Sequence, residues 1–196
     1  VNLFSEDHAA LTGARQVVIA GNLKPERSNS INVAYSNLIL LKNSWKVETD
    51  VNVFYTYFTN RIIANYDIDP NKIIYNNLNG FSESKGVSMD LKISFKNRFL
   101  FQTGFTMMNV SITEDGEKSQ QILTEKISGN WTVTYSFDKL PLSIDYTGNL
   151  VGPMRLPILG SLDPRPEYSK TYSIQNIHFT YTFSSRFAIF GGVKNL

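Results

Sequence analysis

The connections between the predicted strands of this chain are alternately very short and long along its whole length. Eight stretches show the alternation of apolar and polar residues that is typical of β-strands. They span residues 28–41, 45–65, 81–95, 98–112, 124–137, 142–151, 171–184 and 186–196. The short connections are 42–44, 96–97, 138–141 and 185, and the long ones between them are 66–80, 113–123 and 152–170.

This sorting of connections by length constrains the fold class. A soluble β-sandwich has no reason for it, because both of its ends face the same solvent. Bacterial outer-membrane β-barrels have short periplasmic turns and long extracellular loops. The pattern therefore predicts an all-β, antiparallel transmembrane β-barrel segment of about eight strands. It also predicts that the four short connections are periplasmic and the three long ones extracellular, with 1–27 a further irregular, extracellular loop region.

The two faces of the predicted strands differ in polarity. Around Leu91 the apolar residues Val87 and Met89 alternate with the polar residues Asp90 and Lys92. The same alternation recurs in 45–57, 130–137, 142–150 and 177–183. A dry sandwich core does not accept several charged groups, whereas a wet barrel lumen does. We therefore expect the apolar set to face lipid and the polar set to face the lumen.

Composition is compatible with such a barrel and excludes several function classes. Mean hydropathy is −0.18, which is ordinary for a barrel in which only every second strand residue faces lipid. No apolar run reaches the ~18–20 residues of a spanning helix. A net charge of +2 is too small to indicate a nucleic-acid partner, and the chain has no cysteine. The chain starts without a methionine and stops within a strand pattern, so we expect both ends to be cuts through a larger sequence.

Aromatic residues are concentrated beside the short connections. A ring at the same end of successive strands is typical of an interfacial girdle, although aromatic residues also favour strand ends in general. The rings concerned belong to Trp45, Phe95, Phe99, Phe137, Phe183 and Phe187. Lys-Asn pairs at 42–43 and 96–97 favour tight hairpins, because asparagine tolerates positive φ.

The sequence shows no catalytic arrangement and no metal site. His8 and His178 lie far apart, and no Ser, His and Asp set has a recognisable motif. The adjacent residues of 6–8 cannot converge easily on one ion, and the acidic residues of 114–117 lack the spacing of a calcium loop. We therefore expect no enzymatic activity, cofactor or metal.

The best candidate ligand-binding residues lie in the long connections. Segment 152–170 contains two arginines that could clamp an anionic ligand, and four prolines that would stiffen the loop. A rigid cap packed on other loops is an equally good interpretation of this segment. In 66–80, tyrosines face either ligand or solvent. The candidate residues are Arg155, Asp163, Arg165, Tyr168, Tyr66 and Tyr75.

Three stretches resemble the C-terminal part of TonB-dependent outer-membrane receptors, of the type common in Bacteroidetes. Residues 4–15 followed by Asn22-Leu23-Lys24-Pro25-Glu26 resemble that family's "LxPE" entry into a strand. Residues 79–87, Asn-Gly-Phe-Ser-Glu-Ser-Lys-Gly-Val, resemble its "N-x-G…G-V-E" strand, with Ser88 where glutamate is usual. Residues 191–196, Gly-Gly-Val-Lys-Asn-Leu, resemble its "V-x-N-L-F-D" strand. Together they span almost the whole chain in the family's order.

The resemblance implies a 22-stranded barrel of which this chain supplies about eight strands, with the plug domain and the TonB-contacting segment outside it. It implies active transport of a scarce nutrient: a siderophore, haem, cobalamin, a metal or a glycan. The implied partners are outer-membrane lipid, the nutrient, and TonB through the plug; a surface lipoprotein is a further partner that the resemblance allows. A passive porin or small barrel, and a secreted soluble β-sandwich that binds a partner, are the alternatives.

Overall fold

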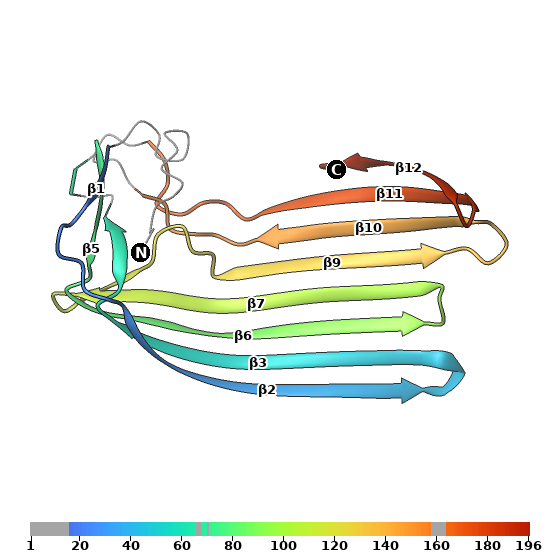
Figure 1. Cartoon of the computed structure of the whole chain (residues 1–196), viewed down its shortest axis with the longest axis horizontal. Coiled ribbons are helices and arrows are strands. Elements are labelled where there is room, and N and C mark those ends of the chain that lie inside the picture. Colours follow the sequence, from blue (N-terminus) through green and yellow to red (C-terminus); the bar gives the residue numbers. More distant parts are fainter. Residues whose placement is uncertain (1–15, 66–67, 70, 158–163) are drawn as a thin grey trace.

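A computed structural model of the chain describes residues 16–65, 68, 69, 71–157 and 164–196. Its main feature is a long antiparallel sheet in a single layer, with a small second sheet at one end (Figure 1). The strand order β12-β11-β10-β9-β7-β6-β3-β2 confirms the eight predicted strands. Their bounds are β2 (Arg27–Leu41), β3 (Trp45–Thr59), β6 (Gly80–Phe95), β7 (Phe99–Glu114), β9 (Ile127–Ser136), β10 (Leu142–Val151), β11 (Tyr172–Ser184) and β12 (Phe187–Lys194).

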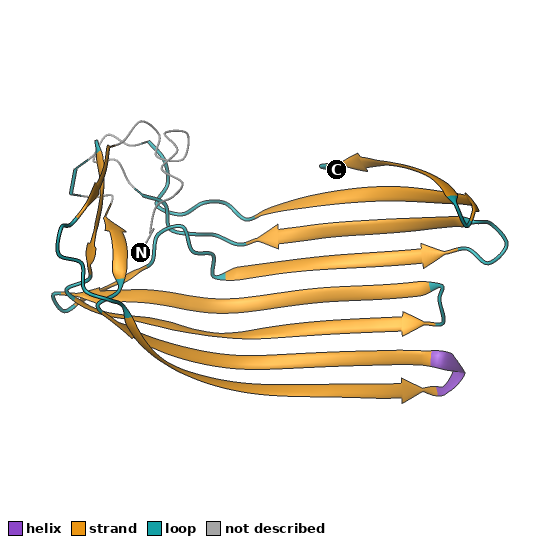
Figure 2. Cartoon of the chain, in the orientation of Figure 1, coloured by secondary structure: helices purple, strands orange, loops and turns teal. Residues whose placement is uncertain are grey.

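The short and long connections lie at opposite ends of the long sheet. All four tight turns are at the right-hand end in Figure 1, which we call the turn end. The long connections and the small sheet are at the other end, the loop end. The 3-10 turn η1 (Lys42–Ser44) is the one helical element in the described residues (Figure 2). In the same part of the chain, no helix is long and apolar enough to cross a membrane.

The register of the sheet separates two faces, as the alternation predicts. Across β3, β6, β7 and β9, Val53 lies opposite Val87, Val87 opposite Met107 and Met107 opposite Ile127. We call this side the apolar face; many of its side chains are exposed, among them Val53, Val87, Met107, Tyr135 and Phe179. The other side is the polar face.

The polar face contains the charged residues of the strands. Asp50 lies opposite Asp90, and Lys92 forms an ion pair with Glu48 at 3.2 Å. The register also places Asp145 on this face, opposite Thr134 of β9. Charged groups on one side and exposed apolar groups on the other suit a barrel wall between water and lipid.

The aromatic residues beside the tight turns lie together on the apolar face. Trp45 stacks on Phe95 with ring centroids 4.7 Å apart and meets the edge of Phe99 at 6.1 Å. At the other side of the sheet, Phe183 contacts Phe187 at 5.6 Å. Rings from successive hairpins thus lie at the turn end, as expected of an interfacial girdle.

The tight turns use positive φ in two different ways. Asn43 has φ 63°, which confirms the role expected of asparagine in the first hairpin. In the second hairpin the positive φ, 48°, belongs to Lys96 and not to Asn97. The Lys-Asn pair therefore marks the turn in both places without fixing which residue has the left-handed conformation.

Three predicted bounds are wrong, all at the loop end. The stretch 45–65 is not one strand, because β3 ends at Thr59 and Asn60 has φ 53°. The next residues form β4 (Ile62–Asn65), which pairs with β5 (Lys72–Asn77) inside the connection predicted as 66–80. The segment 1–27 is not wholly irregular, since β1 (Gln16–Ile19) pairs in parallel with β5.

A fourth difference is an extension of the β7 hairpin beyond the predicted strand. Strand β7 continues to Glu114 and turns through Asp115 and Gly116, which have φ 51° and 85°. The returning strand β8 (Glu117–Gln120) pairs with the end of β7. A positive φ at two successive residues is the geometry of a tight hairpin turn.

The long sheet is open at both sides. Among the described residues, β2 pairs only with β3 and β12 pairs only with β11. The predicted absence of a ladder between 28–41 and 186–196 is confirmed, so these strands do not close an eight-stranded barrel. Burial is correspondingly sparse: the buried apolar side chains of the described residues are Ile73, Leu78 and Val110.

Adjacent residues of β6 test the two-face arrangement. We expect Leu91→Arg on the apolar face to destabilise the assembled barrel by about 2–4 kcal/mol, the cost of a charge near the bilayer midplane. Lys92→Ala on the polar face removes a half-exposed ion pair and should cost at most about 1 kcal/mol. Denaturant unfolding in lipid vesicles measures both, and equal costs would mean that no face contacts lipid.

Candidate ligand site at the loop end

The small sheet is fastened to the long sheet by the residues of the "LxPE" stretch. The side-chain amide of Asn77 donates to the carbonyls of Lys24 and Asn60 at 2.9 and 2.6 Å, and its oxygen accepts from the Lys24 amide at 2.6 Å. The carboxylate of Glu26 accepts from the Ile62 amide at 2.7 Å. These contacts hold β4 and β5 over the loop end, where Leu78 is only 4% exposed.

Arg61 lies at the break between β3 and β4 and is half-buried. Its Nη1 donates to the Oγ of the fully buried Ser82 at 2.6 Å, and its guanidinium lies 4.8 Å from the ring centroid of Phe58. Burial lowers the pKa of Arg61, and the charge of Glu26 opposes that effect. Since Ser82 is neutral and Glu26 is engaged by Ile62, the positive charge has no carboxylate bound directly to it in the described part of the chain.

Arg155 joins the β10–β11 connection to the segment after β8. Its Nε contacts Oε1 of Glu167 at 3.2 Å, and its Nη1 donates to the carbonyl of Gln120 at 3.4 Å. The Arg155 carbonyl accepts from the Leu123 amide at 2.8 Å. The loop is therefore packed on a neighbouring loop, as one of the two interpretations of 152–170 expected.

A cavity of about 370 Å³ lies between these elements. Its polar lining combines the two arginines with amide and carboxylate groups, and isoleucine side chains form the apolar part. The side-chain oxygens of Gln120 and Gln121 are buried, and they have no hydrogen-bond partner in the part of the chain that the structure describes. Unpaired buried acceptors cost free energy, and a ligand that donates hydrogen bonds removes that cost. The polar lining includes Arg61, Asn65, Glu114, Gln120, Gln121 and Arg155.

The structure brings one of the predicted site residues into this cavity. Arg155 lines it. Tyr168 is bridged to Arg155 and lies under the ammonium of Lys126, 5.4 Å from its ring centroid. Arg165 donates to the Pro157 carbonyl at 2.9 Å, and Tyr75 lies in β5 opposite Ala64. Tyr66 and Asp163 are outside the described residues.

Sequence reasoning missed Arg61 and the two glutamines. The signal for Arg61 was the polar pair Asn60-Arg61, which interrupts the alternation within the predicted strand 45–65. Gln120 and Gln121 had no such signal, because they belong to the predicted long connection 113–123, which has no periodic pattern. Their proximity to Arg155 depends on contacts between loops far apart in sequence.

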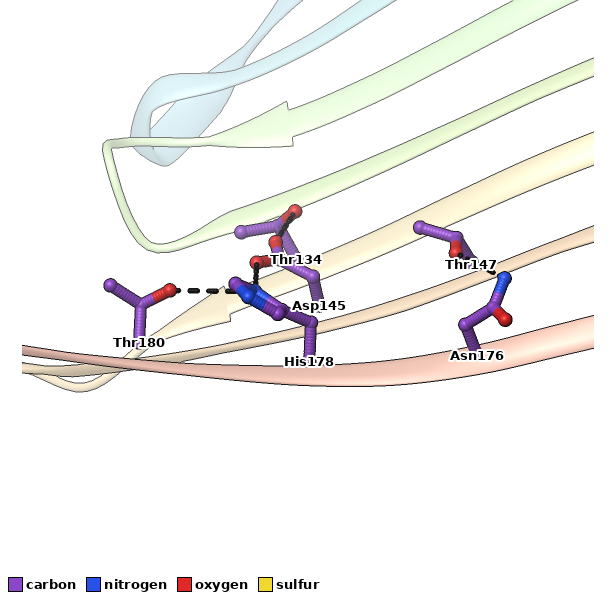
Figure 3. A network of polar contacts seen from close by, with 6 residues as sticks. All are labelled: Thr134, Asp145, Thr147, Asn176, His178 and Thr180. Carbon is purple, nitrogen blue, oxygen red and sulfur yellow. Dashed lines mark hydrogen bonds and ion pairs between the residues drawn. The ribbon is translucent and has the colours of Figure 1, made fainter. Parts of the chain in front are cut away.

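A second group of polar residues lies on the polar face of β9, β10 and β11 (Figure 3). Thr134 donates to Asp145 at 2.6 Å, and Nδ1 of His178 lies 3.7 Å from the other Asp145 oxygen. A nucleophilic triad needs the base between the hydroxyl and the carboxylate. Here Thr134 meets Asp145 directly, and Thr180 and Asp145 both approach the same ring nitrogen, Nδ1 of His178. Neither hydroxyl is therefore placed across the ring from the carboxylate, and the group cross-links strands. The described residues also contain no cluster of three metal-ligating side chains.

The fold and the loop-end cavity define a class: a segment of antiparallel β-barrel wall with a ligand-sized, polar site at one rim. The family model for the TonB dependent receptor-like β-barrel matches residues 2–196. The chain therefore belongs to this family of outer-membrane transport receptors. Its assignment to the Bacteroidetes type stays a prediction, and a comparison with curated proteins gave no match.

Solved structures show the same fold at low sequence identity. The ferric-catecholate import receptor Fiu of Escherichia coli K12 has a TM-score of 0.66 at 16% identity, over 89% of this chain and 24% of Fiu. The pyoverdine receptor FpvA of Pseudomonas aeruginosa PAO1 has 0.66 at 15%, over 88% and 26%. The copper transporter OprC has 0.65 at 10%, over 89% and 26%. The chain thus spans about a quarter of each receptor.

The role of Arg155 in joining the two loops is testable by hydrogen exchange. Arg155→Ala removes its side-chain contacts with Gln120 and Glu167, each worth about 1 kcal/mol net. We expect the amides of Gln121 and Leu123 to exchange about tenfold faster in the full-length receptor, measured by mass spectrometry. Arg186→Ala, at the turn end, should leave both amides unchanged; equal acceleration by the two variants would contradict this role.

Proposed function

We propose that this chain is part of the wall and outer rim of an outer-membrane receptor that imports a scarce nutrient with energy delivered through TonB. Family membership over residues 2–196 supports this proposal, and so does the loop-end cavity. TonB would act through a plug segment that lies outside this chain. The proposal places the tight turns in the periplasm and the loop end, including 1–27, outside the cell.

The cavity favours one kind of cargo chemistry. The half-buried guanidinium of Arg61, which has a neutral partner in Ser82, suits an anionic or strongly polarised oxygen. The unpaired oxygens of Gln120 and Gln121 suit hydroxyl or amide donors. A cargo with both groups, as siderophores and glycans have, satisfies the lining better than a bare metal ion. Haem, cobalamin and metal nevertheless stay among the cargo classes to be tested.

Orientation is the first test of the proposal. Single cysteines at Asn43, Asn97 and Ser185, in the tight turns, should resist a membrane-impermeant thiol reagent on intact cells. Cysteines at Asp115 and Ser161, in the long connections, should be labelled. Permeabilised cells, in which all five positions should be labelled, provide the control, and the reverse pattern on intact cells would invert the orientation.

Energised import is the second test. Cells that express the full-length receptor should grow on the limiting nutrient only when TonB is present. In them, Arg61→Gln should raise the cargo concentration for half-maximal uptake about tenfold or more, because a charge-assisted hydrogen bond contributes about 1.5–3 kcal/mol. Arg98→Gln is the matched control, since Arg98 pairs with Asp138 at the turn end.

The outcome separates the importer from the passive porin. Uptake that continues without TonB and without a proton gradient would support the porin and remove the importer proposal. Arg98→Gln with the same loss as Arg61→Gln would instead mean that the loop-end cavity does not select cargo. The soluble β-sandwich has no support in the long sheet, which is a single layer.

A further inference from the structure

A group of charged and aromatic residues lies on the apolar face, beyond the exposed apolar residues and near the loop end. Glu83 accepts a hydrogen bond from the Tyr55 hydroxyl at 2.8 Å and pairs with the ammonium of Lys118 at 3.1 Å. Lys85, which is exposed, lies directly opposite Tyr55. The ring of Tyr57 stacks on Phe81 at 5.3 Å. None of these residues lines the loop-end cavity, whose lining includes Ile112 and Glu114 of the polar face.

The register places this group on the lipid side. Lys85 and Val87 are two residues apart in β6, so both point to the apolar face. Lys118 lies opposite Thr113, which lies opposite Phe81, so β8 presents its lysine to the same face. In the same row, Arg27 lies opposite Thr59, which is also opposite Phe81.

The height of the group matches the far interface of a bilayer. Tyr55 lies about ten residues along β3 from Trp45, which belongs to the aromatic girdle at the turn end. At ~3.3 Å per residue and a strand tilt of roughly 40°, this separation spans about 25 Å, the height of the apolar band of an outer-membrane barrel. The stacked pair of Tyr57 and Phe81 then belongs to a second aromatic girdle, at the level of lipid headgroups.

The charge balance at this level is positive. In the described strands β2, β3, β6, β7 and β8, the charged side chains on this face are the cations Arg27, Lys85 and Lys118 and the carboxylate of Glu83. The ion pair with Glu83 holds the ammonium of Lys118, a residue of β8, over β6. Lys85 is two residues from Glu83 in the same strand. The side chain of Lys118 is still 56% exposed, so it retains donors for a further partner. Lysine ammonium groups near a membrane surface attract anionic headgroups.

We propose that Lys85 and Lys118, positioned by Glu83, bind the phosphate of a lipid headgroup in the outer leaflet. This inference rests on the membrane placement in the proposed function and not on the cargo. The aromatic rings of Tyr57 and Phe81 contact the region between headgroup and acyl chains, where amphipathic and aromatic side chains are favoured. The site would hold the receptor at a fixed height and rotation in the membrane.

The test uses the full-length receptor in phosphatidylcholine nanodiscs doped with diphosphoryl lipid A or with its dephosphorylated form. Native mass spectrometry measures the bound lipid. The wild type should retain the diphosphorylated lipid preferentially. Lys85→Gln and Lys118→Gln should each lower its binding about fivefold, and the double variant about 25-fold. Electrophoretic heat modifiability checks that each variant is folded, and the single variants suffice should the double variant not assemble.

A matched control lies in the same strand. Lys92 of β6 is seven residues from Lys85 and therefore on the polar face, so Lys92→Gln should leave lipid binding unchanged. Equal retention of the two lipids, an equal loss in Lys92→Gln, or displacement of the lipid by inorganic phosphate would overturn the proposal. If uptake continues without TonB and the lipid preference is intact, the importer proposal fails and the lipid site remains. If TonB-dependent uptake is intact and there is no lipid preference, the lipid site fails and the importer proposal remains.

Discussion

The backbone hydrogen bonds of a strand in lipid have no water to replace them, and the rest of this structure follows from that constraint. Every central strand is paired on both sides, β3 and β6 over nearly their whole length, whereas only three apolar side chains of the described residues are buried. The ladder therefore takes the place that a packed core has in a soluble domain. Among the described residues it also leaves β2 and β12 with an unpaired edge each, and such edges are not stable in a bilayer. The wall requires further strands on both sides.

The same ladder fixes which side of the wall each residue serves, and this holds beyond the apolar band. In β6, Ser82 faces Arg61 and the loop-end cavity, while Glu83 faces Tyr55 and Lys118 on the opposite side. Two adjacent residues at one height thus point to opposite faces of the wall, each toward one of the two proposed sites. A shift of one residue in the register would exchange them. In the functions proposed for these two sites, strand geometry alone keeps the cargo apart from the lipid.

The eight strands of the wall could be predicted because their signal is local: alternation in the strand and tight turns beside it. The loop end could not. The polar pair Asn60-Arg61 interrupts the alternation, but Ile62 and Ile63 resume a β-like composition, so the pair alone does not require the chain to leave the long sheet at Asn60. The parallel pairing of β1 with β5 joins four-residue segments far apart in sequence, too short for a periodic pattern. The cavity could not be predicted for the same reason, because Arg61 and Gln120 come to line it only through contacts between segments far apart in sequence.

This division explains why the family can be recognised from the sequence while the cargo cannot. The stretches that resemble the family are structural: Glu26 holds the Ile62 amide, and Gly86 lies under the ring of Phe54, 2.7 Å from where a Cβ would be. A side chain at Gly86 would displace that ring or the backbone of β7. Arg61, Gln120 and Arg155 are in none of these stretches, and they are free to vary without disturbing the ladder. Receptors of this family can therefore keep one wall and differ in the few residues at its rim.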